Sequence, residues 1–316
     1  MWLKAASRLY GAAWEARRKS YASGRSKQQQ VGARVVSVGN LAVGGTGKTT
    51  LTLSLAHAAL AAGRDAAVVC RRYKPGPTSR GDEEMMMAAA LGERRVYAGT
   101  NKLKLAQDAA AAGHKLLFVD DGFSHWKLAR DLDIVLLDAH DPWAGDELLP
   151  LGRLREPRRA LQRAGIVVVS QATDLAHADT VIAASKPFAP AAVWAAGRHR
   201  ITGVRDLMGA EVTARGPARL VTATGNPESV ARSAREAGFD PVRVSTYRDH
   251  HWFDASEAER ELDRAREEKA ILLLTAKDAV RWPVPEDFVA ILEIEWEWLR
   301  GGDAVLALAL AEGETR

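Results

Sequence analysis

The sequence predicts an α/β protein made of two doubly wound α/β/α domains joined by a hairpin-like linker. Its 316 residues are enough for about two domains. Short β-branched runs alternate with helix-like segments, first before residue 190 and again after residue 217. A glycine-rich turn joins an early strand to a long helix, the arrangement in which α/β folds bind ligands at the ends of parallel strands.

The composition excludes several classes of protein. The formal net charge of +4 is mildly basic, which suits phosphate-bearing ligands or an anionic surface but gives no support for nucleic-acid binding. Cys70 is the only cysteine, so an intrachain disulfide is impossible and a reducing cytoplasm is expected. No apolar run approaches the ~18 residues of a membrane span, and no secretory signal is expected at the N-terminus.

Residues 2–19 predict an amphipathic helix within an N-terminal segment of residues 1–24. Trp2 and Leu9 lie on its apolar stripe with Trp14 beside them, and lysines and arginines occupy the other face. Such a helix can lie in a membrane interface, or it can pack on its own domain and leave a solvated basic face. This stretch alone leaves both alternatives open.

Residues 35–50 predict a phosphate-binding loop (P-loop) between a strand and a helix. Backbone N–H groups of such a loop surround phosphate oxygens, and the helix N-terminus adds partial positive charge. Lys48 can reach the β- and γ-phosphates, and the Thr49 hydroxyl can bind Mg²⁺. Ala42 replaces the usual first glycine, and the alternative is a glycine-rich turn without this role. The residues predicted to contact the nucleotide here are Gly44, Gly45, Thr46, Gly47, Lys48, Thr49 and Thr50.

Carboxylates follow two further strands. An apolar strand ends in Asp120 and Asp121, where a carboxylate can hold Mg²⁺ near Thr49, although Asp-Asp-Gly is also good turn chemistry. Another strand is followed, after a turn, by Asp82 and Glu83 at a predicted helix start. These two residues can form a catalytic or metal-linked site, or they can simply be charges favoured by the helix dipole.

Residues 191–216 alternate extended runs with turn residues and predict the linker. In the α/β pattern that follows it, Asp249 and His250 lie in a loop, where they suit acid–base work or metal binding. Loop histidines are also often simply exposed. Lys277-Asp278 lacks the asparagine of a guanine-reading motif, so ATP is expected rather than GTP.

Residues 145–159 predict a loop rich in arginine, with Arg163 just beyond it. Guanidinium groups bind phosphate through two parallel hydrogen bonds, so this stretch is a candidate phosphate site. The alternative is a solvated charged surface. The arginines are Arg153, Arg155, Arg158, Arg159 and Arg163.

The ordered motifs resemble the tetraacyldisaccharide 4′-kinase family, the lipid A 4′-kinases of Gram-negative bacteria. Besides the glycine-rich loop, the motifs are Gly81-Asp82-Glu83, Asp120-Asp121-Gly122 with His125, Leu154-Arg155-Glu156-Pro157, Gly225-Asn226-Pro227, Asp249-His250 and Lys277-Asp278-Ala279-Val280. Their order and spacing cover nearly the whole chain.

The resemblance implies ATP- and Mg²⁺-dependent phosphorylation of the 4′-hydroxyl of tetraacyldisaccharide 1-phosphate, which forms lipid IVA in lipid A biosynthesis. It implies a peripheral position on the cytoplasmic face of the bacterial inner membrane. The expected partners are lipid A disaccharide 1-phosphate and an anionic membrane surface, with no nucleic acid and no obligate protein partner. The expected parts are a membrane-associated helix (1–24), a P-loop kinase-like domain (25–190), a β-ribbon linker (191–216) and a Rossmann-like domain (217–316).

The resemblance also implies roles for single residues. Asp82 resembles the family's general base, and His250 resembles its partner. The other expected catalytic residues are Lys48 and Asp121, Glu83 and His125 are expected at the nucleotide site, and the expected metal ligands are Thr49, Asp120 and Asp121.

Some positions depart from the family pattern. They are Arg72, Ser124, Arg153 and the Asn101-Lys102 pair. They spare the phosphoryl-transfer residues and bear on substrate contacts, so the preferred acyl pattern is not predicted. Two other classes of function stay open at this point: a nucleotide-hydrolysing switch or chaperone, and a non-catalytic membrane protein with a relic loop.

Overall fold

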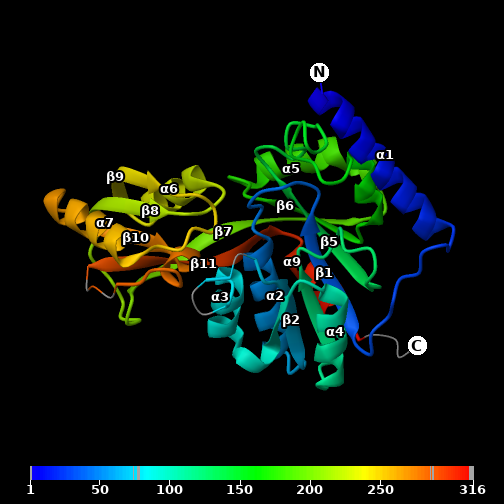
Figure 1. The fold of residues 1–316 in the computed structure, drawn as a ribbon, viewed down its shortest axis with the longest axis horizontal. Coiled ribbons are helices and arrows are strands. Elements are labelled where there is room, and N and C mark those ends of the chain that lie inside the picture. Colours follow the sequence, from blue (N-terminus) through cyan, green and yellow to red (C-terminus); the bar gives the residue numbers. More distant parts are fainter. Residues whose placement is uncertain (1, 74, 77–78, 285, 287, 313–316) are drawn as a thin grey trace. The chain divides into compact units, whose positions relative to one another are not determined.

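The computed structural model describes residues 2–73, 75–76, 79–284, 286 and 288–312. The fold is mixed α/β, and its long-range strand pairing is dominated by parallel strands (Figure 1). The chain divides into two compact units. The first unit comprises Met1–Arg71, Ala90–Arg198 and Trp296–Arg316, and the second comprises Arg72–Ala89 and His199–Glu295.

The first unit contains a parallel sheet with the strand order β3-β2-β4-β1-β5-β6-β7. Its strands are β1 (Arg34–Asn40), β2 (Ala66–Arg71), β3 (Val96–Gly99), β4 (Leu116–Asp120), β5 (Leu132–Asp138), β6 (Ile166–Ser170), the start of β7 (Val193–Asp206) and the end of β11 (Val289–Arg300). Val38 of β1 pairs with Asp120 of β4. The loop after β1 and the carboxylate that ends β4 therefore emerge at the same edge of the sheet.

Helices pack along this sheet. They are α1 (Trp2–Ala22), α2 (Lys48–Ala61), the end of α3 (Asp82–Leu91), α4 (Lys102–Ala111), α5 (Leu175–Ser185) and α9 (Gly302–Ala309), with 3₁₀ turns at Glu93–Arg95, Arg158–Arg163 and Lys186–Phe188. The helix α2 packs on β1, β2 and β4, and α4 packs on β2, β3 and β4 (Figure 1). Strands covered on both faces are apolar throughout, which explains the continuous Val/Leu runs of β4 and β6.

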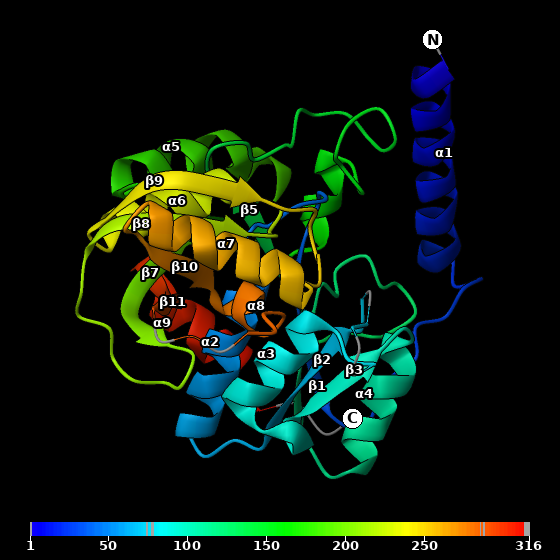
Figure 2. The same ribbon diagram turned by 60° about the vertical axis from the view of Figure 1, so that its left-hand side comes forward.

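The second unit contains parallel strands in the order β11-β10-β8-β9 (Figure 2). Its further elements are β8 (Gly216–Thr222), α6 (Pro227–Glu236), β9 (Phe239–Thr246), α7 (Ala255–Glu267), β10 (Ile271–Thr275) and α8 (Ala276–Ala279). Leu272 of β10 packs with Leu262 of α7, whereas the next residue, Leu273, packs with Ala234 of α6. Because successive side chains of a strand point to opposite faces, helices cover both faces of this sheet.

Most of the predicted elements agree with the structure within a few residues. The strand β3 and the helices α4, α5 and α9 were not predicted from the sequence. These elements are short or rich in alanine, and their apolar residues show no clear period. The predicted linker, residues 191–216, contains the long strand β7 and a turn after which Glu211 lies antiparallel to Arg205. Its role as a linker remains a prediction.

Candidate active site

The glycine-rich loop after β1 has the backbone that its sequence requires. Gly44 and Gly47 have φ angles of 131° and 87°, which side chains other than glycine rarely adopt. Gly47 directly precedes α2, so the first N–H groups of that helix face the loop. A Cβ placed on Gly44 or Gly45 would meet no atom within 4 Å, which leaves open space for a ligand. Lys48 folds over the loop and donates to the Gly44 carbonyl at 3.3 Å.

The other loop residues hold this conformation or begin the helix. Thr46 is buried and accepts a hydrogen bond from the Asn40 amide at 3.2 Å. Gln171 donates to the Gly45 carbonyl at 3.0 Å. Thr50 lies in the first turn of α2. The loop is therefore fixed at both ends while its glycines stay accessible.

Thr49 and Asp120 lie together at the end of the loop, as predicted for a metal site. The Thr49 hydroxyl is 3.3 Å from one oxygen of Asp120, and Thr52 binds the other oxygen at 3.2 Å. The described residues contain no cluster of three or more His, Cys, Asp or Glu side chains that could enclose a metal. Mg²⁺ in a P-loop site needs no such cluster, because phosphates and water complete a hydroxyl–carboxylate pair. The residues present therefore fit Mg²⁺.

Asp121 differs from its neighbour Asp120. Both of its carboxylate oxygens accept hydrogen bonds from Arg155, at 2.6 and 2.7 Å, and Lys48 lies 4.0 Å away. Burial opposes ionisation, but Arg155, Lys48 and Lys102 together hold the pKa of Asp121 well below its usual range. Asp121 is thus a permanent anion that orients two cations, and its predicted part in metal binding remains a prediction.

Lys102 and His125 contact the backbone of the turn that follows β4. Burial and the cations around it lower the pKa of His125 to about 4, so its imidazole is neutral at physiological pH. Lys102 is buried and donates to the carbonyls of Asp120 and Asp121 at 2.6 and 2.5 Å. Lys102, one of the residues that depart from the family pattern, therefore fixes the backbone of the acidic pair.

Asp82 and His250 form a hydrogen-bonded pair in the second unit. The His250 Nδ1 lies 3.0 and 2.9 Å from the two oxygens of Asp82, although the residues are 168 positions apart in the sequence. The sequence-based ranges assigned residues 72–89 to the N-terminal domain, whereas they belong to the second compact unit. The two residues thus lie in one compact unit, and the predicted domain ranges remain predictions.

The environment of the pair keeps the carboxylate ionised. Burial raises the pKa of Asp82, but the hydrogen bond from His250 and the charges of Lys277 and Arg281 lower it below its ordinary value. The Asp82 side chain is only 2% exposed, whereas that of His250 is 12% exposed. The edge of the Tyr73 ring packs on the imidazole with 4.9 Å between ring centroids. The imidazole is therefore the accessible member of the pair.

Lys277 is a functional candidate that the sequence analysis missed. Its ammonium lies 3.4 Å from Nε2 of His250, 3.4 Å from Glu83, 3.7 Å from Asp249 and 3.9 Å from Asp82. Glu83, predicted at the nucleotide site, is thus placed in the second unit beside Lys277. The signal was available, because Lys277 follows β10 at a strand end and belongs to a motif of the family resemblance, but no role was assigned to it.

The arginines of residues 153–163 are all engaged with carboxylates. The pairs are Arg153–Asp141, Arg155–Asp121, Arg158–Asp146, Arg159–Glu15 and Arg163–Glu156. The predicted cationic patch is therefore largely neutralised within the chain. Arg153 and Arg159 are more than half exposed and keep further N–H donors, so the role of this loop as a phosphate site remains a prediction.

Three of the residues that depart from the family pattern each contact an acidic side chain. Arg72 binds both oxygens of Glu84 at 2.7 and 2.8 Å. Ser124 donates to Glu156 at 2.7 Å. Arg153 pairs with Asp141 on the surface. None of these partners belongs to the Thr49–Asp120 pair or to the Asp82–His250 pair.

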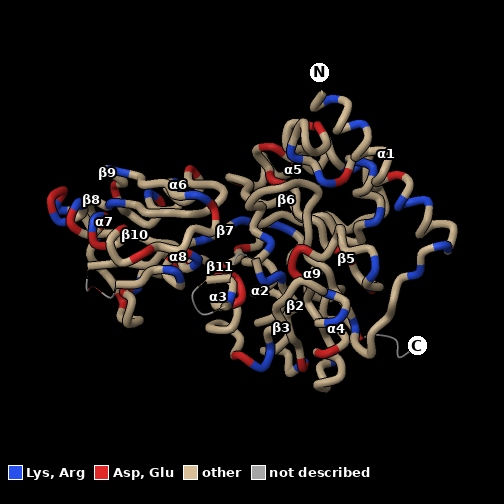
Figure 3. The backbone as a smooth tube through the Cα atoms, in the orientation of Figure 1, with Lys and Arg blue, Asp and Glu red and all other residues tan. Residues whose placement is uncertain are grey.

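The N-terminal helix both packs on its own unit and exposes apolar side chains. Trp14 is buried in the core and donates to Glu156 at 3.0 Å, and Ser7 donates to the Leu148 carbonyl at 2.9 Å. Trp2 and Leu9, in contrast, are 74% and 72% exposed. Lysines and arginines are spread along the same helix (Figure 3). No helix in the described part of the chain is long and apolar enough to cross a membrane.

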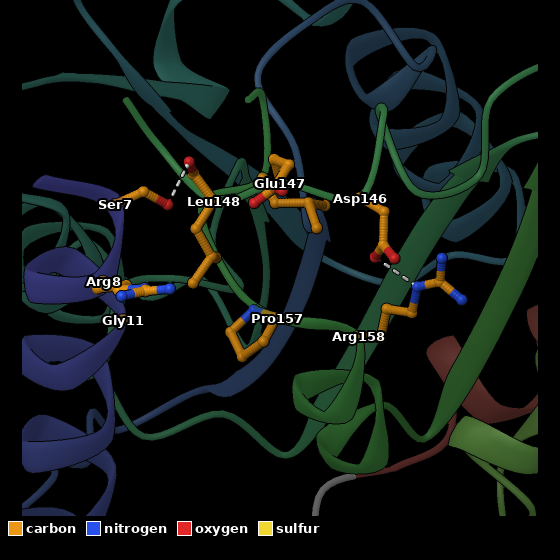
Figure 4. A pocket seen from close by; sticks show the side chains of 9 residues that line it. Ser7, Arg8, Gly11, Asp146, Glu147, Leu148, Pro157 and Arg158 are labelled. Carbon is orange, nitrogen blue, oxygen red and sulfur yellow. Dashed lines mark hydrogen bonds and ion pairs between the residues drawn. The ribbon is translucent and has the colours of Figure 1, made fainter. Parts of the chain in front are cut away.

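A pocket of about 290 Å³ lies between α1 and the loop of residues 146–158. Leu148 and Pro157 line its interior, and the Arg158–Asp146 ion pair lies at one side (Figure 4). Arg8 and Gly11 of α1 form the opposite wall (Figure 4). The pocket is separate from the Thr49–Asp120 pair.

Comparison with known proteins identifies the family. The LpxK model, described as tetraacyldisaccharide-1-P 4′-kinase, matches residues 1–310. A tetraacyldisaccharide 4′-kinase of Anaeromyxobacter sp. (strain Fw109-5) is 33% identical and aligns with 97% of this chain and 90% of its own length. One of Syntrophobacter fumaroxidans (strain DSM 10017 / MPOB) is 38% identical over 89% of this chain and 79% of its own length.

A solved structure has the same fold. The crystal structure of the "apo" form of LpxK from Aquifex aeolicus in complex with ATP matches with a TM-score of 0.72 and 23% identity, covering 96% of this chain and 95% of that one. The fold, the motifs in their order and the sequence relatives agree, and the chain belongs to the tetraacyldisaccharide-1-P 4′-kinase family.

Proposed function

We propose that this protein transfers the γ-phosphate of ATP, with Mg²⁺, to the 4′-hydroxyl of tetraacyldisaccharide 1-phosphate and so forms lipid IVA. The observation that carries the proposal is the glycine-rich loop that leads into Lys48 and Thr49, with the Thr49 hydroxyl 3.3 Å from Asp120, in a chain of this family. Phosphoryl transfer needs positioning and neutralisation of charge more than covalent catalysis, and this arrangement supplies both.

In the first unit, the loop binds the triphosphate. Its backbone N–H groups and the N-terminus of α2 hold the phosphates, and Lys48 swings from the Gly44 carbonyl to a phosphate oxygen. Thr49 and Asp120 hold Mg²⁺, which neutralises phosphate charge when bound. Asp121 keeps Lys48 and Arg155 directed at this site.

In the second unit, the Asp82–His250 pair accepts the proton of the sugar hydroxyl. If Nδ1 donates to Asp82, Nε2 retains a lone pair and is the atom that can take a proton. Asp82 is buried and both its oxygens face Nδ1, so it orients the imidazole and stabilises the cation that forms. The sequence predicted Asp82 as the base, and the burial of its carboxylate favours His250 instead.

The helix α1 attaches the enzyme to an anionic membrane surface, on the cytoplasmic face of the inner membrane. Exposed Trp2 and Leu9 suit the interfacial region of a bilayer, and the basic residues of the helix suit anionic head groups. Arg8 and Gly11, which line the pocket, belong to the same helix as Trp2 and Leu9. The acyl chains of the substrate would stay in the bilayer while the sugar is phosphorylated.

Vesicle co-sedimentation tests the membrane role. Replacing Trp2 and Leu9 by Gln should weaken binding to anionic vesicles about tenfold or more, because two large apolar side chains no longer enter the interface. Leu175→Gln, at a half-exposed leucine of α5, is the control and should bind normally. Equal partitioning of both variants would show that α1 is only a structural helix.

The two compact units correspond, in this proposal, to a P-loop kinase-like domain and a Rossmann-like domain. Helices on both faces of the β8–β11 sheet support the second assignment. Residues 191–216 would then serve as the β-ribbon linker, since β7 passes from one unit to the other.

Incubation with γ-labelled ATP and tetraacyldisaccharide 1-phosphate in mixed micelles tests the reaction. Label should appear in the lipid, at the 4′ position, and only when Mg²⁺ is present. ATP hydrolysis without labelled lipid would instead indicate a nucleotide switch, and failure to bind Mg²⁺-ATP would indicate a relic loop. Either of these results would overturn the proposal.

A further inference from the structure

Among the described residues of the second unit, the most deeply buried cation lies beside the Asp82–His250 pair. Arg281 follows the short helix α8, and its side chain is 0% exposed, as is that of its partner Asp278. Removing a guanidinium from water is costly unless its donors are satisfied. The contacts of Arg281 therefore show which groups satisfy its donors and which segments of the chain it holds together.

The donors of Arg281 join three segments of the chain. It donates to the carbonyl of His251 at 2.9 Å, to that of Ala223 at 3.3 Å and to that of Lys277 at 3.0 Å. It also donates to Asp278 at 2.6 Å, and its Nε lies 3.5 Å from Asp82. A single planar group thus links the end of β8, the start of α8 and the loop that carries His250.

Asp278 completes this arrangement. One of its oxygens accepts from the Ala223 backbone N–H at 2.9 Å, and the other accepts from the Thr275 hydroxyl at 2.7 Å. The Ala223 carbonyl in turn accepts the backbone N–H of His250 at 3.2 Å. The backbone N–H of His250 is therefore bonded to Ala223, and both members of the buried Arg281–Asp278 pair are also hydrogen-bonded to Ala223.

The backbone of His250 needs such support. Its φ angle is 63°, in the left-handed region that residues other than glycine rarely occupy. Such a conformation persists only where the surroundings enforce it. Here the enforcing contacts are the hydrogen bond from His250 to Ala223 on one side and the hydrogen bond from Arg281 to the His251 carbonyl on the other.

We propose that Arg281, with Asp278, is a positioning residue that fixes the loop of His250 so that the imidazole stays on the Asp82 carboxylate. Arg281 lies 3.5 Å from the Asp82 carboxylate but makes no contact with the imidazole of His250, which it positions through the loop. A lysine in its place would keep the positive charge but could not reach several carbonyls at once, because it lacks the planar fork of donors. The kinetic part of this inference rests on the proposed function, and the geometric part does not.

The test compares Arg281→Lys with Arg264→Lys, which alters a half-exposed arginine that pairs with Glu261 at 3.0 Å. Arg281→Lys should lower kcat for lipid phosphorylation about 10- to 100-fold, the cost of a catalytic group displaced by about 1 Å. KM for ATP should stay unchanged, because the nucleotide loop belongs to the first unit. Arg264→Lys should change neither parameter.

Nuclear magnetic resonance of ¹⁵N-histidine-labelled full-length protein supplies a readout that is independent of activity. The His250 Nδ1 proton, assigned by comparison with His250→Gln, should give a distinct hydrogen-bonded signal in the wild type and in Arg264→Lys. It should be lost or averaged in Arg281→Lys. An unchanged signal together with an unchanged kcat would overturn the proposal.

Asp278→Asn keeps the proposal testable if Arg281→Lys does not fold. The amide oxygen can still accept from Ala223, but the negative charge that holds the guanidinium is gone. The same loss of signal is expected, and a wild-type signal would contradict the role of the ion pair. Absence of lipid phosphorylation in the wild type would refute the proposed function and leave this spectroscopic test intact.

Discussion

The two candidate sites use the same structural device but differ in how the sequence encodes them. Each lies where parallel strands end and helices begin, the place where α/β proteins bind ligands. In the first unit, the loop and its helix form one continuous stretch, and Asp120 is joined to Thr49 across 71 positions. In the second, His250 meets Asp82 across 168 positions and Lys277 meets Glu83 across 194.

This difference separates two kinds of function. In the proposed function, the local site holds a common ligand, the triphosphate, for which backbone N–H groups and a helix N-terminus suffice. The long-range site must hold an imidazole against a carboxylate, which needs side chains fixed from several segments. The predictions below test whether the first site serves nucleotide binding and the second serves proton acceptance.

The largest effect is expected at His250. His250→Ala should lower kcat about 10²- to 10⁴-fold, because it removes the proton acceptor, and should leave KM for ATP unchanged. Steady-state kinetics of lipid phosphorylation measure both parameters. His251→Ala is the control, since that neighbour pairs with Glu257 at 2.7 Å rather than with Asp82, and it should lose far less activity. Similar losses in both variants would assign the effect to the loop as a whole.

Lys48→Ala should cost about 10²- to 10³-fold in turnover, because a charge on the transferring phosphoryl group is lost. Unlike His250→Ala, it should also weaken ATP binding, which isothermal titration calorimetry measures. Lys104→Ala, at an exposed lysine paired with Asp108, is the control. Near-normal activity of Lys48→Ala would refute the assignment of the loop.

Asp120→Asn and Asp121→Asn should separate metal binding from the orientation of cations. Asp120→Asn should raise the Mg²⁺ concentration needed for half-maximal rate, since Asp120 faces the Thr49 hydroxyl. Asp121→Asn should lower kcat about tenfold with little change in Mg²⁺ dependence, since Asp121 binds Arg155. Mg²⁺ titrations of the rate distinguish the two. An equal shift in Mg²⁺ dependence would restore Asp121 as a metal ligand.

A smaller effect is expected at Lys277. Asp82 must be ionised to hold the imidazole, so activity is lost as pH falls through the pKa of Asp82. Lys277 lowers the pKa of Asp82, so Lys277→Met should raise the pKa of Asp82 and move the acidic limb of the kcat profile to higher pH, by about one unit. The other charged groups around the pair and Lys277 are Asp249, Glu83 and Arg281, and they are unchanged in the Lys277→Met variant. Lys277→Arg should keep the wild-type profile, and an unmoved limb in Lys277→Met would show that this charge does not tune the pair.

Much of the fold and of the first site was predictable from the sequence. β-branched runs buried on both faces read as strands, and Gly44 and Gly47 occupy backbone conformations that favour glycine. The position of Asp120 followed from a strand that ends in a carboxylate. Each of these inferences rested on residues that are close together in the sequence.

The second site was only partly predictable. The motif match singled out Asp82 and His250, but spacing along the chain could not show that residues 72–89 belong to the second unit. The roles of Lys277 and Arg281 depend on distances between segments that no local pattern encodes. The ion pairs of the arginine-rich loop were not predictable for a related reason, because the carboxylates that pair with Arg155 and Arg159 lie elsewhere in the sequence.

The most direct test of the account is the coupling between Asp82 and His250 in the transfer of labelled phosphate from ATP to tetraacyldisaccharide 1-phosphate. The rates of Asp82→Asn, His250→Ala and the double variant are compared with the wild-type rate. If the two residues accept the proton as a unit, the double variant should be no more than about twofold slower than the slower single variant. Losses that add fully on a logarithmic scale would contradict the pair and leave the 2.9 Å hydrogen bond without a catalytic role.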